Sequence, residues 1–421
     1  MSSYKSPRRC AFRTFPVAGV FTLSSHGPER INPSNKKIVV LLFCLALISF
    51  LVFRTDGADP GMCAEEKEWI TDHFDGDLFF NPGLHTPPPS PPGEEPQRGR
   101  SGWIWRLILG NDWPKWPQTT DGAPGETPAV RVPKGSLIVT PVGHATFLIQ
   151  LDGLNILTDP IWSDRCSPVS WAGPKRYRDP GLRFEDLPPI DAVLVSHNHY
   201  DHLDLPTLKR LARKGVQRSI TTLGNRDLIH NAGISAVDEL DWWQQVRMSE
   251  EVTVTLVPAQ HFSSRTPWDR NKTLWGGFVI SGPSGNVFYS GDTGYGPHFR
   301  EISQRFSPIR VALLPISPFR PPQSNEPPHR HYPEIHMAPA EAVQAHLDLR
   351  ARLSVAAHFQ VFQLGADGFD DALNELRSAL AERDLNPDAF IAPPPGQPVE
   401  LTARFDNMDG LVSLQMAGAN R

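Results

Sequence analysis

The sequence predicts an α/β fold in which helices cover β-sheets, preceded by one N-terminal transmembrane helix. Three observations lead to this prediction. Short apolar strand patterns recur between residues 136 and 357, helical patterns lie among them, and one long apolar run stands near the N-terminus. No internal period of about 20 to 50 residues is visible, which argues against a solenoid or a propeller.

The long apolar run covers residues 38–53, which are bracketed by Lys36, Lys37 and Arg54. As a helix it would extend about 24 Å at about 1.5 Å per residue, so the flanking basic side chains would have to reach the surfaces of a hydrocarbon core about 30 Å thick. A cleaved signal peptide is the alternative. The segment before the run is long for a signal peptide, and no small-x-small cleavage site follows it. We therefore expect a single-pass membrane anchor.

The segments on either side of the anchor differ in composition. Residues 1–37 form a basic tail whose charges favour a cytoplasmic N-terminus, although the nearest flanks are almost balanced, which leaves the side of the main body open. Residues 54–134 form a Pro- and Trp-rich linker and arm, with an extended polyproline-like stretch at 82–96. Tryptophans in this arm would contact a membrane interface or pack on the main body, and we favour packing. They are Trp103, Trp105, Trp113 and Trp116.

The main body is expected at residues 135–403, followed by a C-terminal tail at 404–421. It begins with a β-meander in which the Asp152-Gly153 hairpin signal joins two apolar runs. The apolar run 192–196 predicts a buried strand, and a helix follows with Asp204 as its N-cap and Gly215 at its end. The meander covers 137–140, 144–151 and 154–160; further strands are expected at 252–258, 275–281, 286–290, 311–316 and 353–357, and helices at 338–352 and 370–382.

The overall composition excludes several classes of protein. With 421 residues, of which 39% are hydrophobic and 21% charged, the chain can bury a core, so fully disordered and fibrous classes are excluded. The net charge of -5 offers no bulk attraction for nucleic acid, so no nucleic-acid partner is predicted. The 4 cysteines are too few and too scattered for a disulfide framework.

The decisive motif is His197-Asn198-His199-Tyr200-Asp201-His202, which directly follows the predicted strand 192–196. Open α/β sheets bind ligands at the carboxyl ends of their strands, where an irregular loop lets neighbouring side chains converge. Imidazoles with a carboxylate suit zinc, and iron or manganese would use similar ligands. A solvated His-rich turn is the alternative for one or two histidines, but four potential ligands in this arrangement favour a metal site.

Three more potential ligands follow strand ends: His261, Asp292 and His358. Each alone is more typical of a capping or core residue. Together with the motif they are enough for two metals, whereas a structural zinc needs only about four ligands and would close its shell. We therefore predict a catalytic centre with two metal ions.

These residues resemble the pattern of the metallo-β-lactamase superfamily, a His-x-His-x-Asp-His motif followed by a distant His, an Asp and another His. The resemblance implies a four-layer αβ/βα sandwich with the site at the edge between two sheets. It implies that His197, His199 and His261 hold one zinc, that Asp201, His202 and His358 hold the other, and that Asp292 bridges both with a water-derived hydroxide. Asp159 matches the family's first motif, which implies a carboxylate that supports a ligand from behind.

Longer strings are similar to the N-acyl-phosphatidylethanolamine-hydrolysing phospholipase D family, including SHNHYDHLD, GPKRYR, PAQHFSSRT and HMAPAEAV. This resemblance implies zinc-dependent cleavage of the substrate to phosphatidate and N-acylethanolamine by a metal-bridging hydroxide, with a phospholipid and a membrane as partners. The chain departs from the family in its anchor with the basic tail and in a Pro-rich insertion at 318–333. The insertion leaves acyl-chain and head-group preference open. The oligomeric state is also open, with a homodimer as one option.

The remaining roles divide into catalytic and structural candidates. Asp201, Asp292 and His336 are the catalytic candidates, and His336 would hydrogen-bond the phosphate or the leaving oxygen, with a purely structural role as its alternative. We expect His144 to be structural, and His329 and His331 to be surface residues. Alternative functions are another hydrolase on the same scaffold, such as a lactonase, a cyclic phosphodiesterase or a β-lactamase, or a non-catalytic envelope protein.

Overall fold

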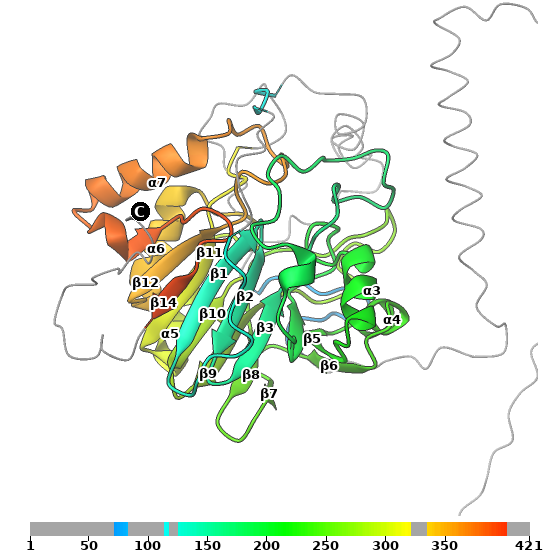
Figure 1. Ribbon diagram of the computed structural model, residues 1–421. Coiled ribbons are helices and arrows are strands. Elements are labelled where there is room, and N and C mark those ends of the chain that lie inside the picture. The colour runs from blue at the N-terminus through cyan, green and yellow to red at the C-terminus, as the bar shows by residue number, and fades with distance from the viewer. Residues whose placement is uncertain (1–70, 83–112, 118–124, 321–334, 402–421) are drawn as a thin grey trace, which may run out of the picture. The chain divides into compact units, whose positions relative to one another are not determined.

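The computed structural model describes residues 71–82, 113–117, 125–320 and 335–401. Within these ranges two seven-stranded sheets pack face to face (Figure 1). The first sheet has the order β14 (Val399–Leu401), β1 (Leu137–Gly143), β2 (Thr146–Leu151), β3 (Leu154–Thr158), β4 (Ala192–Val195), β5 (Arg218–Thr222) and β6 (Ala236–Leu240). The second has the order β13 (Phe390–Ile391), β12 (Leu353–Ala357), β11 (Ile309–Pro315), β10 (Gly285–Tyr289), β9 (Gly277–Gly282), β8 (Thr253–Val257) and β7 (Gln245–Arg247).

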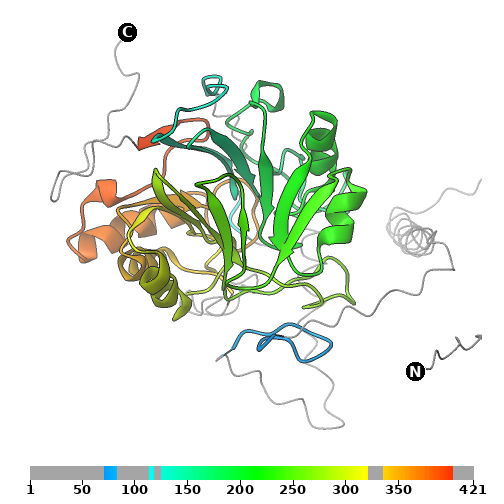
Figure 2. The ribbon, with the colours of Figure 1, turned by 90° about the horizontal axis from the view of Figure 1, so that it is seen from below.

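Helices cover the outer face of each sheet (Figure 2). The first sheet is covered by α3 (Leu205–Arg213) and α4 (Arg226–Asn231), and the second by α5 (His298–Phe306), α6 (Pro339–Leu349) and α7 (Asp371–Glu382). Short 3-10 turns, η1 and η2, lie at Phe184–Asp186 and Pro387–Ala389. The layers follow from burial on both sheet faces, because each apolar face must be covered by another element. The four-layer αβ/βα sandwich expected from the resemblance is confirmed.

The core between the sheets is built from alternate residues of strands that face one another. Phe147, Trp275, Phe278 and Tyr289 are at most 1% exposed and belong to one apolar cluster shared by both sheets. Separate clusters lie under α3 and α4 and under α5 to α7. Since both faces of each sheet are buried, central strands such as β4 and β11 read as continuous apolar runs.

Parallel pairing brings several strand ends to one edge. β3, β4, β5 and β6 are parallel neighbours, and so are β10, β11, β12 and β13. The loops after β4, β10 and β12 carry candidate ligands at this edge. β8 runs antiparallel to β9 and therefore in the direction of β10, so the loop that carries His261 lies at the same edge. The β1–β2 turn comes to the same region, because the backbone N–H of His358 donates to His144 O at 2.9 Å.

The predicted elements are present, with bounds that differ by a few residues. The predicted helix 338–352 ends earlier, at Leu349, because Arg350 adopts a left-handed backbone with φ 51°. The sequence analysis missed the strands β5, β6, β7, β13 and β14 and the helices α4 and α5. The buried hydroxyl side chains of β5 are hydrogen-bonded to backbone carbonyls of β4. Thr221 Oγ1 donates to Val195 O at 3.0 Å, and Ser219 Oγ donates to Val193 O at 3.1 Å. A polar sequence therefore forms a buried strand.

Two short segments that precede the sheets pack on them. Phe79 is fully buried in the core between the sheets, and His73 Nε2 lies 2.8 Å from Asp241 Oδ1. Trp113 and Trp116 are buried, and Trp116 Nε1 donates to Asp367 O at 2.8 Å. For these two tryptophans the packed arrangement is the one observed.

The predicted anchor at 38–53 lies outside the described residues, as do Trp103, Trp105, most of the proline stretch, His329 and His331. In the described part of the chain, no helix is both long enough and apolar enough to cross a bilayer.

Candidate metal centre

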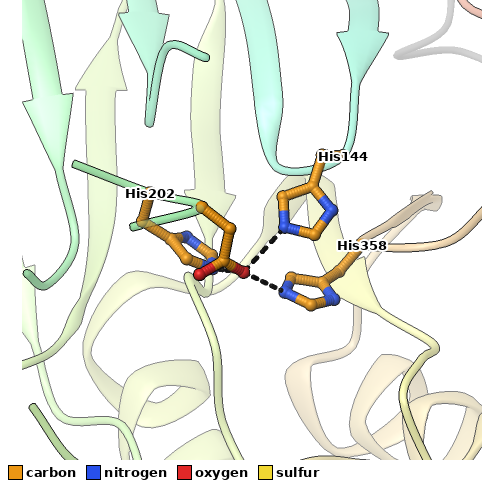
Figure 3. A group of neighbouring side chains, drawn as sticks. His144, His202 and His358 are labelled. Carbon is orange, nitrogen blue, oxygen red and sulfur yellow. Dashed lines mark hydrogen bonds and ion pairs between the residues drawn. The ribbon is translucent and has the colours of Figure 1, made fainter. Parts of the chain in front are cut away.

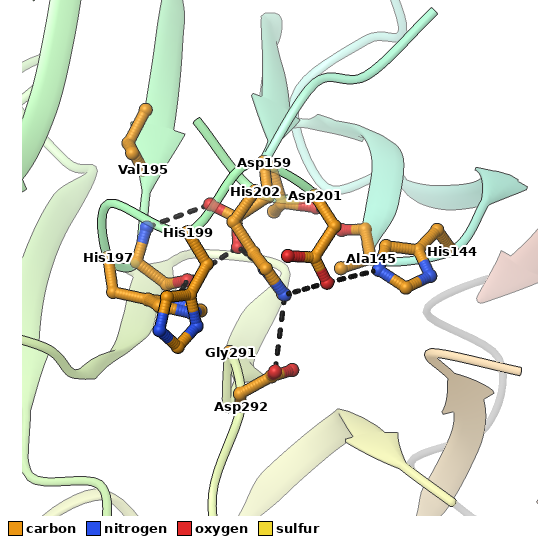
Figure 4. Close-up of polar contacts among 12 residues, drawn as sticks. His144, Ala145, Asp159, Val195, His197, His199, Asp201, His202, Gly291 and Asp292 are labelled. Atoms are coloured by element: carbon orange, nitrogen blue, oxygen red, sulfur yellow. Dashed lines mark hydrogen bonds and ion pairs between the residues drawn. The ribbon is translucent and has the colours of Figure 1, made fainter. Parts of the chain in front are cut away.

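The motif loop lies between β4 and α3 and turns sharply at its centre. The backbone N–H of Leu203 donates to His199 O at 2.8 Å, so the chain folds back within four residues. This turn lets neighbouring side chains point in different directions, as a regular helix or strand would not. Figure 4 shows His197 and His199 on one side of His202, and Asp201 on the other.

The first group of candidate ligands consists of His197, His199 and His261. His199 Nδ1 lies 2.8 Å from His197 Nε2 and 3.2 Å from His261 Nε2. His261 donates from Nδ1 to Ile335 O at 2.8 Å, which leaves a lone pair on Nε2 for a metal. Burial lowers the pKa of His199 and of His261 to about 3. Both rings are therefore neutral, the form that binds metals.

The second group consists of Asp201, His202 and His358, joined by His144 (Figure 3). Asp201 Oδ2 lies 3.2 Å from His202 Nε2 and 3.2 Å from His358 Nε2. It also lies 2.9 Å from His144 Nε2. His144, which was expected to be structural, therefore lies in contact with this group.

Asp292 faces both groups. Its Oδ2 lies 3.3 Å from His202 Nε2, 3.3 Å from His358 Nε2 and 3.7 Å from His261 Nε2. Asp292 Oδ1 and His202 Nε2 are buried and find no hydrogen-bond partner among the described residues. Buried polar atoms without partners are costly, and a cation between them would satisfy both. The donors present, imidazole nitrogens and carboxylate oxygens, therefore fit divalent metal ions.

The carboxylates of Asp201 and Asp292 require positive charge close to them. Burial raises the pKa of Asp292, but His202 and His358 outweigh it and hold the pKa of this carboxyl well below its usual range. Burial lowers the pKa of His358, but Asp292 and Asp201 raise it to about 9. The buried carboxylates of Asp201 and Asp292 lie against the same two imidazole nitrogens, those of His202 and His358. Their negative charges must be balanced by protons or by a cation. At neutral pH, metal ions would take the place of those protons.

Asp159 orients the His202 ring through a hydrogen bond to its Nδ1. Its Oδ2 accepts from His202 Nδ1 at 2.6 Å and from the hydroxyls of Ser196 and Tyr289, and its Oδ1 accepts from Ser196 N at 2.7 Å. The carboxylate is fully buried. Because Nδ1 of His202 is committed to this bond, its Nε2 faces Asp201 and Asp292 and is the ring atom left for a metal ion.

His336 lies at the more open side of the centre. Its Nδ1 is 3.9 Å from Asp292 Oδ2, and its ring centroid is 5.1 Å from that of His261. With 12% of the side chain exposed, it is more accessible than the rings of His202 and His261, which are fully buried. Its neighbour Ile335 accepts the bond from His261, so the segment that carries His336 also orients a candidate ligand.

Arg265 braces the motif loop, a role that the sequence analysis did not find. Its guanidinium Nη1 donates to Asn198 O at 2.8 Å and to Leu203 O at 2.8 Å, and it stacks 4.0 Å above the Tyr200 ring. Asn198 Oδ1 in turn accepts from Ser264 N at 2.9 Å. The loop after β8 is therefore hydrogen-bonded to both ends of the loop after β4. The sequence signal was the string PAQHFSSRT, in which Arg265 lies four residues after His261.

Comparison with known proteins agrees with this geometry. A family model described as a β-lactamase superfamily domain matches residues 154–359. An uncharacterised protein of Mycobacterium tuberculosis is 37% identical over 273 residues, which cover 63% of this chain and 69% of that protein. The N-acyl-phosphatidylethanolamine-hydrolyzing phospholipase D 1 of Caenorhabditis elegans is 35% identical over 285 residues, which cover 64% of this chain and 78% of that protein.

The chain belongs to the metallo-β-lactamase superfamily. As a member of this superfamily it is a metal-dependent hydrolase, and its His and Asp groups are suited to divalent metal ions. Among solved structures, a metallo hydrolase of the archaeon Ignicoccus hospitalis aligns with a TM-score of 0.47 at 23% identity, covering 63% of this chain and 98% of that chain.

Proposed function

We propose that this protein is a membrane-anchored, zinc-dependent phospholipase D that hydrolyses N-acyl-phosphatidylethanolamine to phosphatidate and N-acylethanolamine. The observation that carries the proposal is the 35% identity to the Caenorhabditis elegans enzyme of that name over 78% of its length. The geometry supports it, because seven candidate ligands converge in two groups with Asp292 between them.

The chain's own residues divide the work of the reaction. His197, His199 and His261 would hold one ion, Asp201, His202 and His358 the other, and Asp292 would contact both. A bound pair of divalent ions supplies hydroxide near neutral pH and neutralises charge that gathers on the phosphoryl oxygens. Asp159 keeps the His202 ring in the tautomer that can bind metal.

His336 is our candidate for the group that contacts the substrate. It is placed beside Asp292 on the more exposed side of the centre, within reach of a phosphodiester bound there. Its imidazole would donate a hydrogen bond to a phosphoryl oxygen or to the departing oxygen of N-acylethanolamine. Hydroxide would attack phosphorus, and the bond from phosphorus to the ethanolamine oxygen would break. The departing oxygen would take up the proton that the hydroxide brought, which leaves phosphatidate and N-acylethanolamine.

Zinc and the membrane anchor complete the proposal. The donors of the two groups are nitrogen and oxygen atoms, which suit zinc, and iron or manganese would find the same ligands. Elemental analysis of protein purified without added metal would identify the ion. The apolar run 38–53 would place the enzyme where its lipid substrate lies.

The test uses full-length protein in detergent, N-acyl-phosphatidylethanolamine and heavy-oxygen water. Mass spectrometry should find the label in phosphatidate and none in N-acylethanolamine, because hydroxide attacks phosphorus. Label in N-acylethanolamine would refute attack at phosphorus. No turnover by protein that carries both ions would refute this substrate and point to another hydrolase reaction on the same scaffold.

A further inference from the structure

We propose that His144 is a positioning residue of the metal centre, whose Nε2–H donates to Asp201 and orients that carboxylate toward the ion. The inference rests on the proposed metal centre and adds a residue that none of the sequence motifs assigned to it. It concerns the second group, in which Asp201, His202 and His358 are the candidate ligands.

The backbone of His144 is held in an uncommon conformation. The residue lies in the turn between β1 and β2 and has φ 58°, a left-handed backbone that residues other than glycine adopt rarely. Such conformations persist where the surrounding structure holds them, and they are concentrated at functional sites. Here the carbonyl oxygen of His144 accepts from His358 N at 2.9 Å. The turn that carries His144 is thereby tied to the backbone of a candidate ligand.

The side chain of His144 points at the second group (Figure 3). Its Nε2 lies 2.9 Å from Asp201 Oδ2, and its ring centroid is 3.9 Å from that of His358. The residue is only 4% exposed, and its Nδ1 finds no hydrogen-bond partner among the described residues. A buried imidazole directed in this way makes its single specific polar contact with the metal group.

Metal binding by the neighbouring rings would leave His144 as the hydrogen-bond donor to Asp201. Asp201 Oδ2 has three imidazole nitrogens around it, those of His144, His202 and His358. Once His202 and His358 give their Nε2 lone pairs to a metal, neither can donate a hydrogen bond to Asp201. Among the described residues around this oxygen, His144 then supplies the remaining N–H. Removing such a partner of a metal-binding carboxylate weakens metal affinity by about 10–100-fold in general.

The alternative is that His144 is itself a ligand. Side-chain amides separate the two roles, because glutamine places an N–H donor near the position of imidazole Nε2 but is a poor zinc ligand. Asparagine carries the same amide on a shorter side chain and does not reach Asp201. His144→Gln should therefore preserve a donor role, whereas His144→Asn and His144→Ala should not.

The experiment measures zinc stoichiometry and affinity of the full chain by competition with a chromophoric chelator, without substrate. The variants are His144→Gln, His144→Asn and His144→Ala, and the control is His230→Ala at an exposed position on α4. We expect alanine and asparagine to weaken one of the two ions by about 10–100-fold, while glutamine and the control stay close to the wild type. Circular dichroism checks that each variant is folded.

Several results would overturn the proposal. Wild-type affinity for both ions in the alanine variant would show that His144 has no such role. If His144→Gln binds zinc as weakly as His144→Asn, His144 is a metal ligand and not a hydrogen-bond donor. This comparison distinguishes the two roles even if the alanine variant does not fold. A wild-type protein that binds only one ion would remove the second group altogether. By contrast, two tightly bound ions without phospholipid turnover would refute the proposed substrate and leave this inference in place.

Discussion

At the scale of single residues, the centre depends on side chains that have more than one task. Asp159 accepts four hydrogen bonds, and one of them sets the tautomer of His202. His261 is oriented by a backbone carbonyl, that of Ile335. These outer contacts leave the ligand atoms pointing inward with lone pairs available, so little reorganisation is needed when metal binds.

Asp292 offers the sharpest test at this scale. Replacing it by alanine removes the candidate carboxylate that faces both groups. Because loss of a residue that only hydrogen-bonds a metal ligand costs about 10–100-fold, we expect kcat/KM to fall by at least about 100-fold. Asp227→Ala, at an exposed position on α4, is the matched control and should leave the rate unchanged. Steady-state kinetics and metal content are measured together. An Asp292→Ala enzyme with full activity and full metal content would contradict the assigned role.

At the scale of elements, loops from different sheets hold one another in place. The motif loop after β4 supplies ligands to both groups, and the loop after β8 braces its two ends through Arg265. Arg265 is half-buried, and burial lowers the pKa of its guanidinium. Its contacts with the two carbonyls and with the Tyr200 ring hold the side chain in place. The rigidity of the motif loop is therefore a property of two elements together.

Replacing Arg265 tests this bracing. Arg265→Ala leaves Asn198 O and Leu203 O without their donor, and each buried carbonyl left without a partner costs about 1–3 kcal/mol. Because the loop carries ligands for both ions, the affinity for both should fall. Arg213→Ala, an exposed arginine in the last turn of α3, is the control. Chelator competition measures both proteins, and unchanged affinities in Arg265→Ala would show that the loop holds its shape without the arginine.

At the scale of the whole molecule, the centre joins the two sheets. Asp159 and the motif loop follow strands of the first sheet, whereas His261, Asp292 and His358 follow strands of the second. Bound metal would therefore link two edges that otherwise meet through a cluster of buried imidazoles and carboxylates. An ion that binds only the folded state stabilises it by mass action, by about 2.7 kcal/mol at a concentration 100 times Kd.

Removing metal should therefore lower the melting temperature. For a body of this size about 1 kcal/mol corresponds to about 2–4 °C, so chelation should lower Tm by on the order of 5 °C or more. Differential scanning calorimetry of the full chain with and without chelator measures the change, and added zinc should restore it. The Asp292→Ala variant should respond less, because it binds metal less well. An unchanged Tm after verified removal of metal would show that the sheets do not depend on the centre.

Much of the fold and the seven candidate ligands could be inferred from the sequence. The meander, the buried strand 192–196 and the motif after it are local patterns, because strand periodicity and neighbouring positions in a loop are properties of adjacent residues. His261, Asp292 and His358 were found for the same reason, since each follows a readable strand. Polar strands such as β5 were missed because their hydroxyl groups are satisfied by a neighbouring strand.

Contacts between distant segments were decided only by the tertiary structure. His144 lies 57 residues from Asp201 in the chain, and nothing in its own segment indicates that the turn between β1 and β2 reaches the motif loop. Arg265 lies 67 residues from Asn198, and its role depends on how the loops after β4 and β8 meet. Local patterns specify which residues form a strand or a loop. The order and register of the strands across two packed sheets specify which side chains meet, and that arrangement arises from burying both sheet faces at once.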